Sequence, residues 1–212
     1  MFHADRVIDV TQPLGPGTAC WPGDAPFELE WTLRRDRGDS VDVAAIRMSV
    51  HTGTHVDGPL HVMPGMTAGE LPLDRFMGPA VVVDARPHLS GAGAVLPSAL
   101  DGVDAARTPR VLFRTSDEVD PTRFPDAVAA LSPALARRVV EAGFVLVGTD
   151  APSVDPPESR SLDAHRILAE AGIPNVENLV LSEVSPGEYT FVGLPLRLAG
   201  ADSAPLRAVL VP

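Results

Sequence analysis

Residues 51–61 read His-Thr-Gly-Thr-His-Val-Asp-Gly-Pro-Leu-His and contain three of the six histidines of the chain. Gly53 argues against a helix here and favours an extended or turning backbone. In an extended backbone, His55 and Asp57 point to one face because their spacing is i, i+2. His51 can rejoin them across the Gly53 turn. The run therefore predicts an extended or turning segment in which polar side chains converge.

These side chains are of the metal-ligating type. Imidazole and carboxylate are usual ligands of Zn, Mn or Fe at neutral pH. His51, His55 and Asp57 would leave coordination positions open for water and substrate, as a catalytic metal requires. The next turn returns His61 to the same place, either as a further ligand or as a general acid/base. The alternative is a set of hydrogen-bonded structural histidines, which four such groups at this density disfavour.

Composition bounds the class of protein. The chain has 212 residues, of which 45% are apolar, enough for one domain over residues 1–212 with a full core. The sequence contains no run of eighteen apolar residues, so we expect no membrane span. The net charge of −11 disfavours nucleic-acid binding. Cys20 is the single cysteine, and the N-terminus lacks a signal-peptide pattern, so a cytoplasmic location is expected.

The hydrophobic pattern predicts a mixed α/β domain with more sheet than helix. One helix should begin at its N-cap Ser132 and run to Gly143, and another should span Ser161–Ala171. Residues 86–109 are expected to form surface loops around a short helix near 97–100. The predicted strands are Arg6–Val10, Phe27–Leu33, Val41–Val50, Ala80–Asp84, Val111–Arg114, Phe144–Gly148, Asn178–Leu181, Tyr189–Leu194 and Arg207–Val211.

Residues 51–61 closely resemble the signature of the cyclase-like metal hydrolases, whose best-known members are kynurenine formamidases and isatin hydrolases. The resemblance runs from about Val7 to Val211. Glu177 follows His165 by twelve residues, the spacing that this family uses for its second metal. Further matching segments are Trp21–Asp24, Gly148–Pro156, Leu162–His165, Leu194–Arg197 and Ala204–Val209.

The resemblance implies a two-metal site. His51, His55 and Asp57 would hold one divalent ion, and Asp57 would bridge to a second ion held by His165 and Glu177. Zn is the expected metal, while Mn and Fe suit the same ligands. Without the resemblance, the histidine on the second predicted helix and the glutamate beyond it would read as ordinary surface residues.

The resemblance also implies a swivelling β/β/α fold in a homodimer and the hydrolysis of N-formyl-L-kynurenine to L-kynurenine and formate, a step of tryptophan catabolism. His61 would give and take the proton, and Trp21 would line the pocket of this aryl formamide. Trp21 precedes Pro-Gly-Asp, so a loop position is expected, where an aromatic side chain often binds ligand.

Two departures from the formamidase pattern keep other substrates open. Arg166 stands where many formamidases have a second histidine, and Pro174–Leu179 looks more like the broader cyclase family. An isatin hydrolase or another cyclic-amide or ester hydrolase is therefore the nearest alternative. A non-enzymatic metal- or ligand-binding protein on the same scaffold is the alternative from another class.

Overall fold

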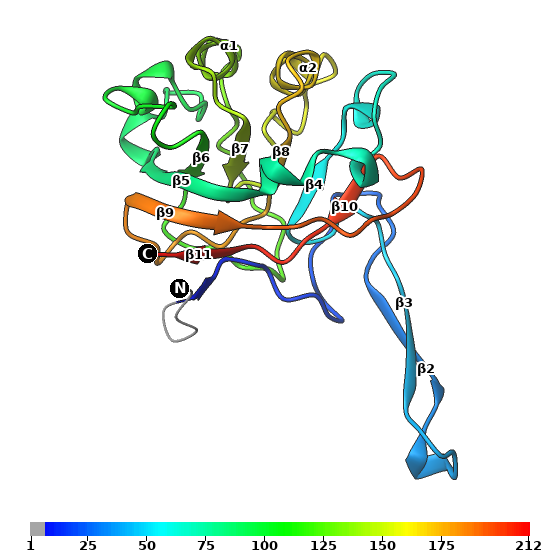
Figure 1. The fold of residues 1–212 in the computed structure, drawn as a ribbon. Coiled ribbons are helices and arrows are strands. Elements are labelled where there is room, and N and C mark those ends of the chain that lie inside the picture. Colours follow the sequence, from blue (N-terminus) through cyan, green and yellow to red (C-terminus); the bar gives the residue numbers. More distant parts are fainter. Residues whose placement is uncertain (1–6) are drawn as a thin grey trace.

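The computed structural model describes residues 7–212, and within them we find one nine-stranded sheet, one two-stranded hairpin and two α-helices (Figure 1). The strands are β1 (Ile8–Asp9), β2 (Glu28–Leu33), β3 (Val43–Arg47), β4 (His55–Asp57), β5 (Met77–Asp84), β6 (Arg110–Arg114), β7 (Leu146–Thr149), β8 (Asn175–Glu177), β9 (Gly187–Val192), β10 (Ser203–Pro205) and β11 (Val209–Val211). The helices are α1 (Pro133–Ala142) and α2 (Asp163–Glu170). The predicted mixed α/β class, richer in sheet than in helix, is confirmed.

The large sheet has the order β1-β11-β9-β5-β6-β7-β8-β4-β10. Its central strands β5, β6, β7 and β8 run parallel to one another. The strands on either side, beginning with β9 and β4, pair antiparallel. Both helices lie over one face of the sheet, as Figure 1 shows.

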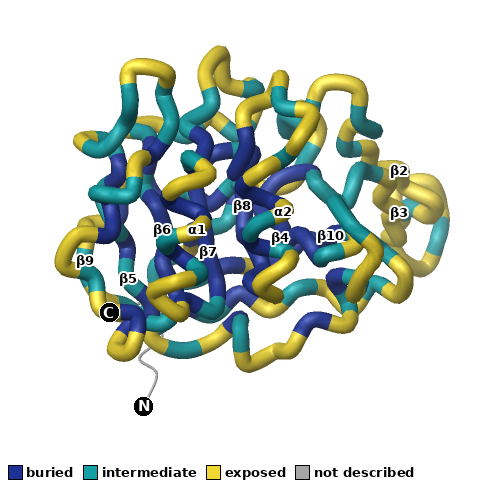
Figure 2. Tube along the Cα trace, turned by 90° about the horizontal axis from the view of Figure 1, so that it is seen from above, coloured by how far each residue is buried: buried dark blue, intermediate teal, exposed yellow. Residues whose placement is uncertain are grey.

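Strands β6, β7 and β8 are buried almost throughout, whereas β5 is only partly buried. In β6, Val111 and Phe113 belong to a core cluster that includes residues of α1 and α2, whereas Leu112 belongs to a second cluster. Phe191 of β9 and Leu210 of β11 close that second cluster on the other face of the sheet. Because both faces are covered at β6, its three middle residues, Val111 to Phe113, form a continuous apolar run, as in many parallel strands. Figure 2 shows the buried residues gathered along these strands.

The two predicted helices are present. The sequence predicts the ends of α1 more accurately than those of α2. Helix α1 begins as predicted, because the Ser132 Oγ accepts a hydrogen bond from the Leu135 N–H at 3.2 Å. It ends at Gly143, whose φ is 83°. Helix α2 is shorter than predicted, because Leu162 has a φ of 49° and breaks the helical backbone before Asp163.

Strands β2 and β3 form the hairpin, which projects away from the rest of the molecule (Figure 1). Every residue of both strands is exposed. The hairpin nevertheless carries large apolar side chains, such as Trp31 and Ile46, which are 41% and 61% exposed. The predicted strand Val41–Val50 is therefore too long, since β3 ends at Arg47 and a turn separates it from His51.

The prediction for Asn178–Leu181 is wrong. Asn178 has a φ of 58° and ends β8, so the strand lies before this segment. The three-residue strands β4 and β10 have no separate prediction, because they are too short for a periodic pattern.

Residues 86–109 contain the short helix that the sequence predicts, a 3₁₀ helix over Pro97–Leu100. Ala99 and Leu100 are buried in the core beneath the helices, so this segment covers the core and is not only surface loop. Of the predicted strand Arg6–Val10, Arg6 lies outside the described residues, and the strand is β1.

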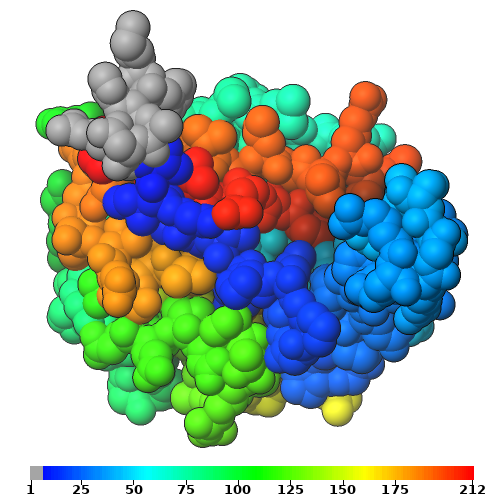
Figure 3. All heavy atoms as spheres, turned by 90° about the horizontal axis from the view of Figure 1, so that it is seen from below, coloured from blue at the N-terminus to red at the C-terminus, as the bar shows by residue number. Residues whose placement is uncertain are grey.

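The two ends of the described chain lie together. Strand β1 pairs antiparallel with β11, and Figure 3 shows the N-terminal residues in blue against C-terminal residues in red. Neither helix found in residues 7–212 has the length and apolar character needed to cross a membrane.

Candidate metal centre

Strands β4 and β8 build the wall of the candidate site. They pair antiparallel with His55 opposite Glu177 and Asp57 opposite Asn175. Because side chains alternate along a strand, these four polar groups share one face. All four are buried, with His55 only 1% exposed. The prediction that His55 and Asp57 lie on one face is confirmed.

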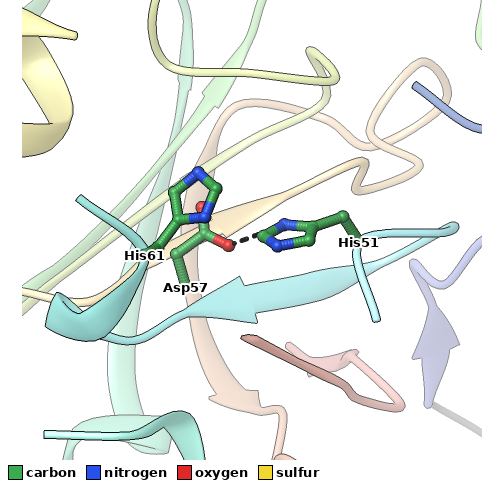
Figure 4. Close-up of side chains that lie close together, drawn as sticks. All are labelled: His51, Asp57 and His61. Carbon is green, nitrogen blue, oxygen red and sulfur yellow. Dashed lines mark ion pairs between the residues drawn. The ribbon is translucent and has the colours of Figure 1, made fainter. Parts of the chain in front are cut away.

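His51 and His61 reach this wall from short turns on either side of β4. The turn before β4 needs Gly53, whose φ is 67° and whose Cβ, if present, would lie 2.5 Å from the Leu14 Cδ2. The His51 Nδ1 lies 3.1 Å from the Asp57 Oδ1 (Figure 4). His61 ends a 3₁₀ helix that follows β4, and its ring centroid is 4.5 Å from that of His51.

His165 joins the cluster from the first turn of α2. Its Nε2 lies 3.2 Å from the Glu177 Oε1 and 3.4 Å from the Asp57 Oδ2. Its Nδ1 lies 2.7 Å from the Asp155 Oδ2. Asp155 also accepts hydrogen bonds from the backbone N–H groups of Ala164 and His165, so one carboxylate both caps the helix and orients the ring.

The cluster fits divalent metal ions. Two sets of three potential ligands have donor atoms within 4.8 Å of one another: His51, Asp57 and His61, and His55, Asp57 and Glu177. Within residues 7–212, the buried His55 Nε2 and Asp57 Oδ1 have no hydrogen-bond partner. Unpaired buried polar atoms are costly, and a cation between them would satisfy both. Imidazole nitrogen and carboxylate oxygen are suitable donors for zinc.

The pKa values of the clustered side chains also indicate a site for a cation. Burial lowers the pKa of His51, but contacts with the carboxylates of Asp57 and Asp202 outweigh burial and raise that pKa to about 9. Burial raises the pKa of the Asp57 carboxyl, yet close contacts with the imidazoles of His165 and His51 hold it well below its usual range. The pKa of Glu177 is also lowered, because contacts with imidazoles outweigh its burial and the charge of Asp57. The cluster therefore holds ionised carboxylates that require nearby positive charge.

Sequence reasoning missed three residues that support the cluster. The Asp202 Oδ2 lies 2.9 Å from the His51 Nε2 and 3.2 Å from the His61 Nδ1. The Asn175 amide donates to Asp57 at 2.9 Å and to Glu177 at 3.0 Å. The third is Asp155, whose carboxylate caps α2 and contacts His165. Asp202 and Asn175 have no local pattern of their own, and only the pairing of β4 with β8 and β10 brings them here.

A cavity of about 1250 Å³ opens over the cluster. His51, His55 and His61 lie in its lining. Trp21 lies in a loop and lines the cavity, and its ring meets that of Phe124 edge-on at a centroid distance of 5.2 Å. A deep polar centre beneath an aromatic wall is typical of a site for an aromatic small molecule.

The Cyclase family model matches residues 8–156 of this chain. The chain belongs to the cyclase family. This member is 47% identical over 207 residues to the kynurenine formamidase of Salinibacter ruber, and the match covers 96% of each chain. It is 40% identical over 208 residues to the kynurenine formamidase of Paracidovorax citrulli, covering 95% of this chain and 94% of the relative.

Among solved structures, the cyclase-family chain resembles isatin hydrolase A from Labrenzia aggregata bound to benzyl benzoate. The TM-score is 0.80 and the identity is 26%, over 97% of this chain and 93% of the other. The predicted family and the cyclase-like hydrolase fold are confirmed.

Proposed function

We propose that this cyclase-family protein is a metal-dependent kynurenine formamidase, which hydrolyses N-formyl-L-kynurenine to L-kynurenine and formate in tryptophan catabolism. The observation that carries the proposal is the buried cluster of imidazoles and carboxylates, two of whose atoms lack partners, beneath a cavity with an aromatic wall. The names of the two relatives at 47% and 40% identity support the choice of substrate.

In this proposal five residues hold two divalent ions. His51, His55 and Asp57 would hold the first ion, and His165 and Glu177, together with Asp57, would hold the second. We favour zinc, whose usual ligands these are, with Mn or Fe suited to the same donors. When bound, such ions lower the pKa of a water towards 7 and act as Lewis acids for a carbonyl group.

His61 supplies the proton that the aryl amine needs as it leaves. Its side chain is 28% exposed, whereas that of His55 is 1% exposed, so His61 is the more accessible to a substrate. Asp202 holds the Nδ1 side of the ring, which leaves Nε2 as the nitrogen facing away from that carboxylate. A positioned general acid of this kind contributes typically about 10²–10⁴-fold to the rate.

Trp21 positions the aromatic ring of the substrate. It lies on the cavity wall against Phe124, and the two rings offer an apolar surface beside the polar cluster. Stacking there would hold the formamide group over the cluster and reduce the entropy lost on reaching the transition state.

We also propose that the protein works as a homodimer through the β2–β3 hairpin. The hairpin presents Leu29, Trp31 and Leu33, each 41% exposed, together with Ile46. Apolar strands that project into solvent favour burial against another surface, and a second copy of the chain is the simplest partner. A cytoplasmic location belongs to the same proposal, because Cys20 is the single cysteine.

The experiment compares two substrates on one preparation. Purified protein is assayed with N-formyl-L-kynurenine and with isatin, before and after a chelator and then with zinc restored. We expect chelator-sensitive turnover of the formamide that exceeds turnover of isatin. Faster turnover of isatin would favour the second candidate, which the similarity in fold to isatin hydrolase A supports. Bound metal with no turnover of either compound would favour a binding protein.

A further inference from the structure

The segment 115–129, which connects β6 to α1, forms one side of the cavity. Figure 3 shows it in green beside N-terminal residues in blue. The Ala19 N–H donates to the Pro121 carbonyl at 2.8 Å, and Phe124 packs against Trp21. The segment therefore lies next to the wall on which the aromatic ring of the substrate is proposed to stack.

Arg123 gives this segment a distinctive charge. The sequence has no lysine, and of the 17 arginines only Arg123 lines the cavity among the described residues. Apart from the histidines of the cluster, the other charged side chains of the lining are carboxylates, including Asp24, Glu118 and Asp120. A ligand carboxylate would be repelled along most of this wall and attracted to the guanidinium of Arg123.

Arg123 forms an ion pair with Asp126, three residues along the chain. The two side chains are 66% and 84% exposed, so the pair is weak and exchanges easily with another partner. A guanidinium has five N–H donors and binds a carboxylate through two of them. Arg123 therefore has donors available for a ligand while Asp126 stays beside it.

The pair places a positive group beside a negative one, which is complementary to the charged groups of an amino acid. An α-amino acid places an ammonium next to a carboxylate, so its carboxylate can meet Arg123 while its ammonium meets Asp126. In N-formylkynurenine, three carbons separate the aromatic ring from the carboxylate. Arg123 directly precedes Phe124 and lines the same cavity as Phe124 and Trp21, so a head group extending from a ring held there can meet it.

We propose that Arg123, with Asp126, binds the α-amino-acid head of the substrate and so determines specificity. This inference rests on the proposed function and deepens it. Isatin has no such head group, so the ion pair would favour formylated amino-acid substrates over uncharged aryl amides that enter the same cavity. The metal cluster would serve the hydrolysis of both substrate classes, whereas Arg123 would bind only the formylated amino acids.

The test uses two formamides that differ only in the head group: N-formyl-L-kynurenine and 2-formamidoacetophenone, which keeps the ring, ketone and formamide. We expect Arg123→Gln to raise KM for N-formyl-L-kynurenine about 10- to 100-fold, the usual loss for a charged hydrogen bond, with little change in kcat. Its KM for 2-formamidoacetophenone should stay within about twofold of wild type. The matched control is Arg137→Gln, at an exposed position of α1 outside the cavity, which should change neither KM.

A second readout does not depend on turnover. Calorimetry should show that Arg123→Gln and Asp126→Asn weaken the binding of L-kynurenine but not of 2-aminoacetophenone. An equal loss for both compounds, or no loss for either, would overturn the inference while leaving the hydrolase standing. If the wild-type protein hydrolyses neither formamide, the proposed function fails, and this inference fails with it.

Discussion

Strands β3 and β4 are close in sequence and opposite in environment. All five residues of β3 are exposed, although the strand reads Val-Ala-Ala-Ile-Arg. All three residues of β4 are buried, although the strand reads His-Val-Asp. Both strands depart from the usual placement of apolar residues inside and charged residues outside. Apolar side chains left in solvent indicate a surface for a partner, and charges taken out of solvent indicate a ligand.

Metal binding and turnover should be more sensitive to the loss of a charge in the buried strand β4 than in the exposed hairpin. Asp57→Asn is expected to lose bound metal and turnover together, because Asp57 belongs to both candidate ligand sets. The fall in metal affinity should exceed the roughly 100-fold typical of residues that only support ligands. Metal analysis and turnover are measured on the same sample. The control is Asp36→Asn in the exposed hairpin, where the side chain is 62% exposed and the same change should have no effect.

His61→Ala should separate chemistry from metal binding. We expect kcat to fall about 10²–10⁴-fold while metal content is retained, because His61 is proposed to transfer a proton and not to hold an ion. The control is His88→Ala, whose ring lies outside the cluster and bonds to Ser98 at 2.9 Å. A metal-free His61→Ala protein would instead make His61 a ligand, as its place in one candidate set allows.

Asp155→Asn should weaken the site without removing a ligand. The substitution replaces a charged acceptor at the His165 Nδ1 by a neutral one, which lowers the basicity of the ring. Metal affinity is expected to fall about 10- to 100-fold, measured by competition with a chromogenic chelator. Restoring turnover with excess zinc would confirm that the effect acts through the metal. Unchanged affinity would show that Asp155 serves only as the cap of α2.

Substitutions in the exposed β2–β3 hairpin should instead weaken the association of two copies of the chain. Ile46→Glu, at the most exposed of the large apolar positions in the hairpin, should weaken the homodimer about tenfold or more. Sedimentation at several concentrations measures the dissociation constant. Glu30→Gln changes a charge in the same hairpin without removing apolar surface and should leave it unchanged. A wild-type protein that stays monomeric at every concentration would contradict the dimer proposal.

Local chemistry made part of the site predictable. The spacing of His55 and Asp57 is a property of a strand, so the sequence alone indicates that they share a face. Ser132 and Gly143 likewise predict the ends of α1, because caps act over a few residues. The single domain over residues 1–212 stays a prediction.

Long-range pairing made the rest unpredictable. Glu177 reaches the site only because β8 pairs with β4. The family resemblance, and not the local sequence pattern, indicates it as a ligand. Asn175 and Asp202 were missed for the same reason. The prediction for residues 178–181 failed because Asn178 adopts a left-handed backbone, which Asn tolerates better than most residues, and this ends the strand. Nothing in the apolar pattern of β3 distinguishes a projecting hairpin from a core strand.

In the proposed enzyme, the buried cluster on β4, β8 and α2 binds the metal ions on which hydrolysis depends. The most direct test is a zinc titration of chelated protein, with turnover of N-formyl-L-kynurenine measured at each addition. We expect no turnover in the metal-free protein and a rise in turnover that ends when about two ions are bound per chain. Full turnover in protein shown to be metal-free would contradict this proposal.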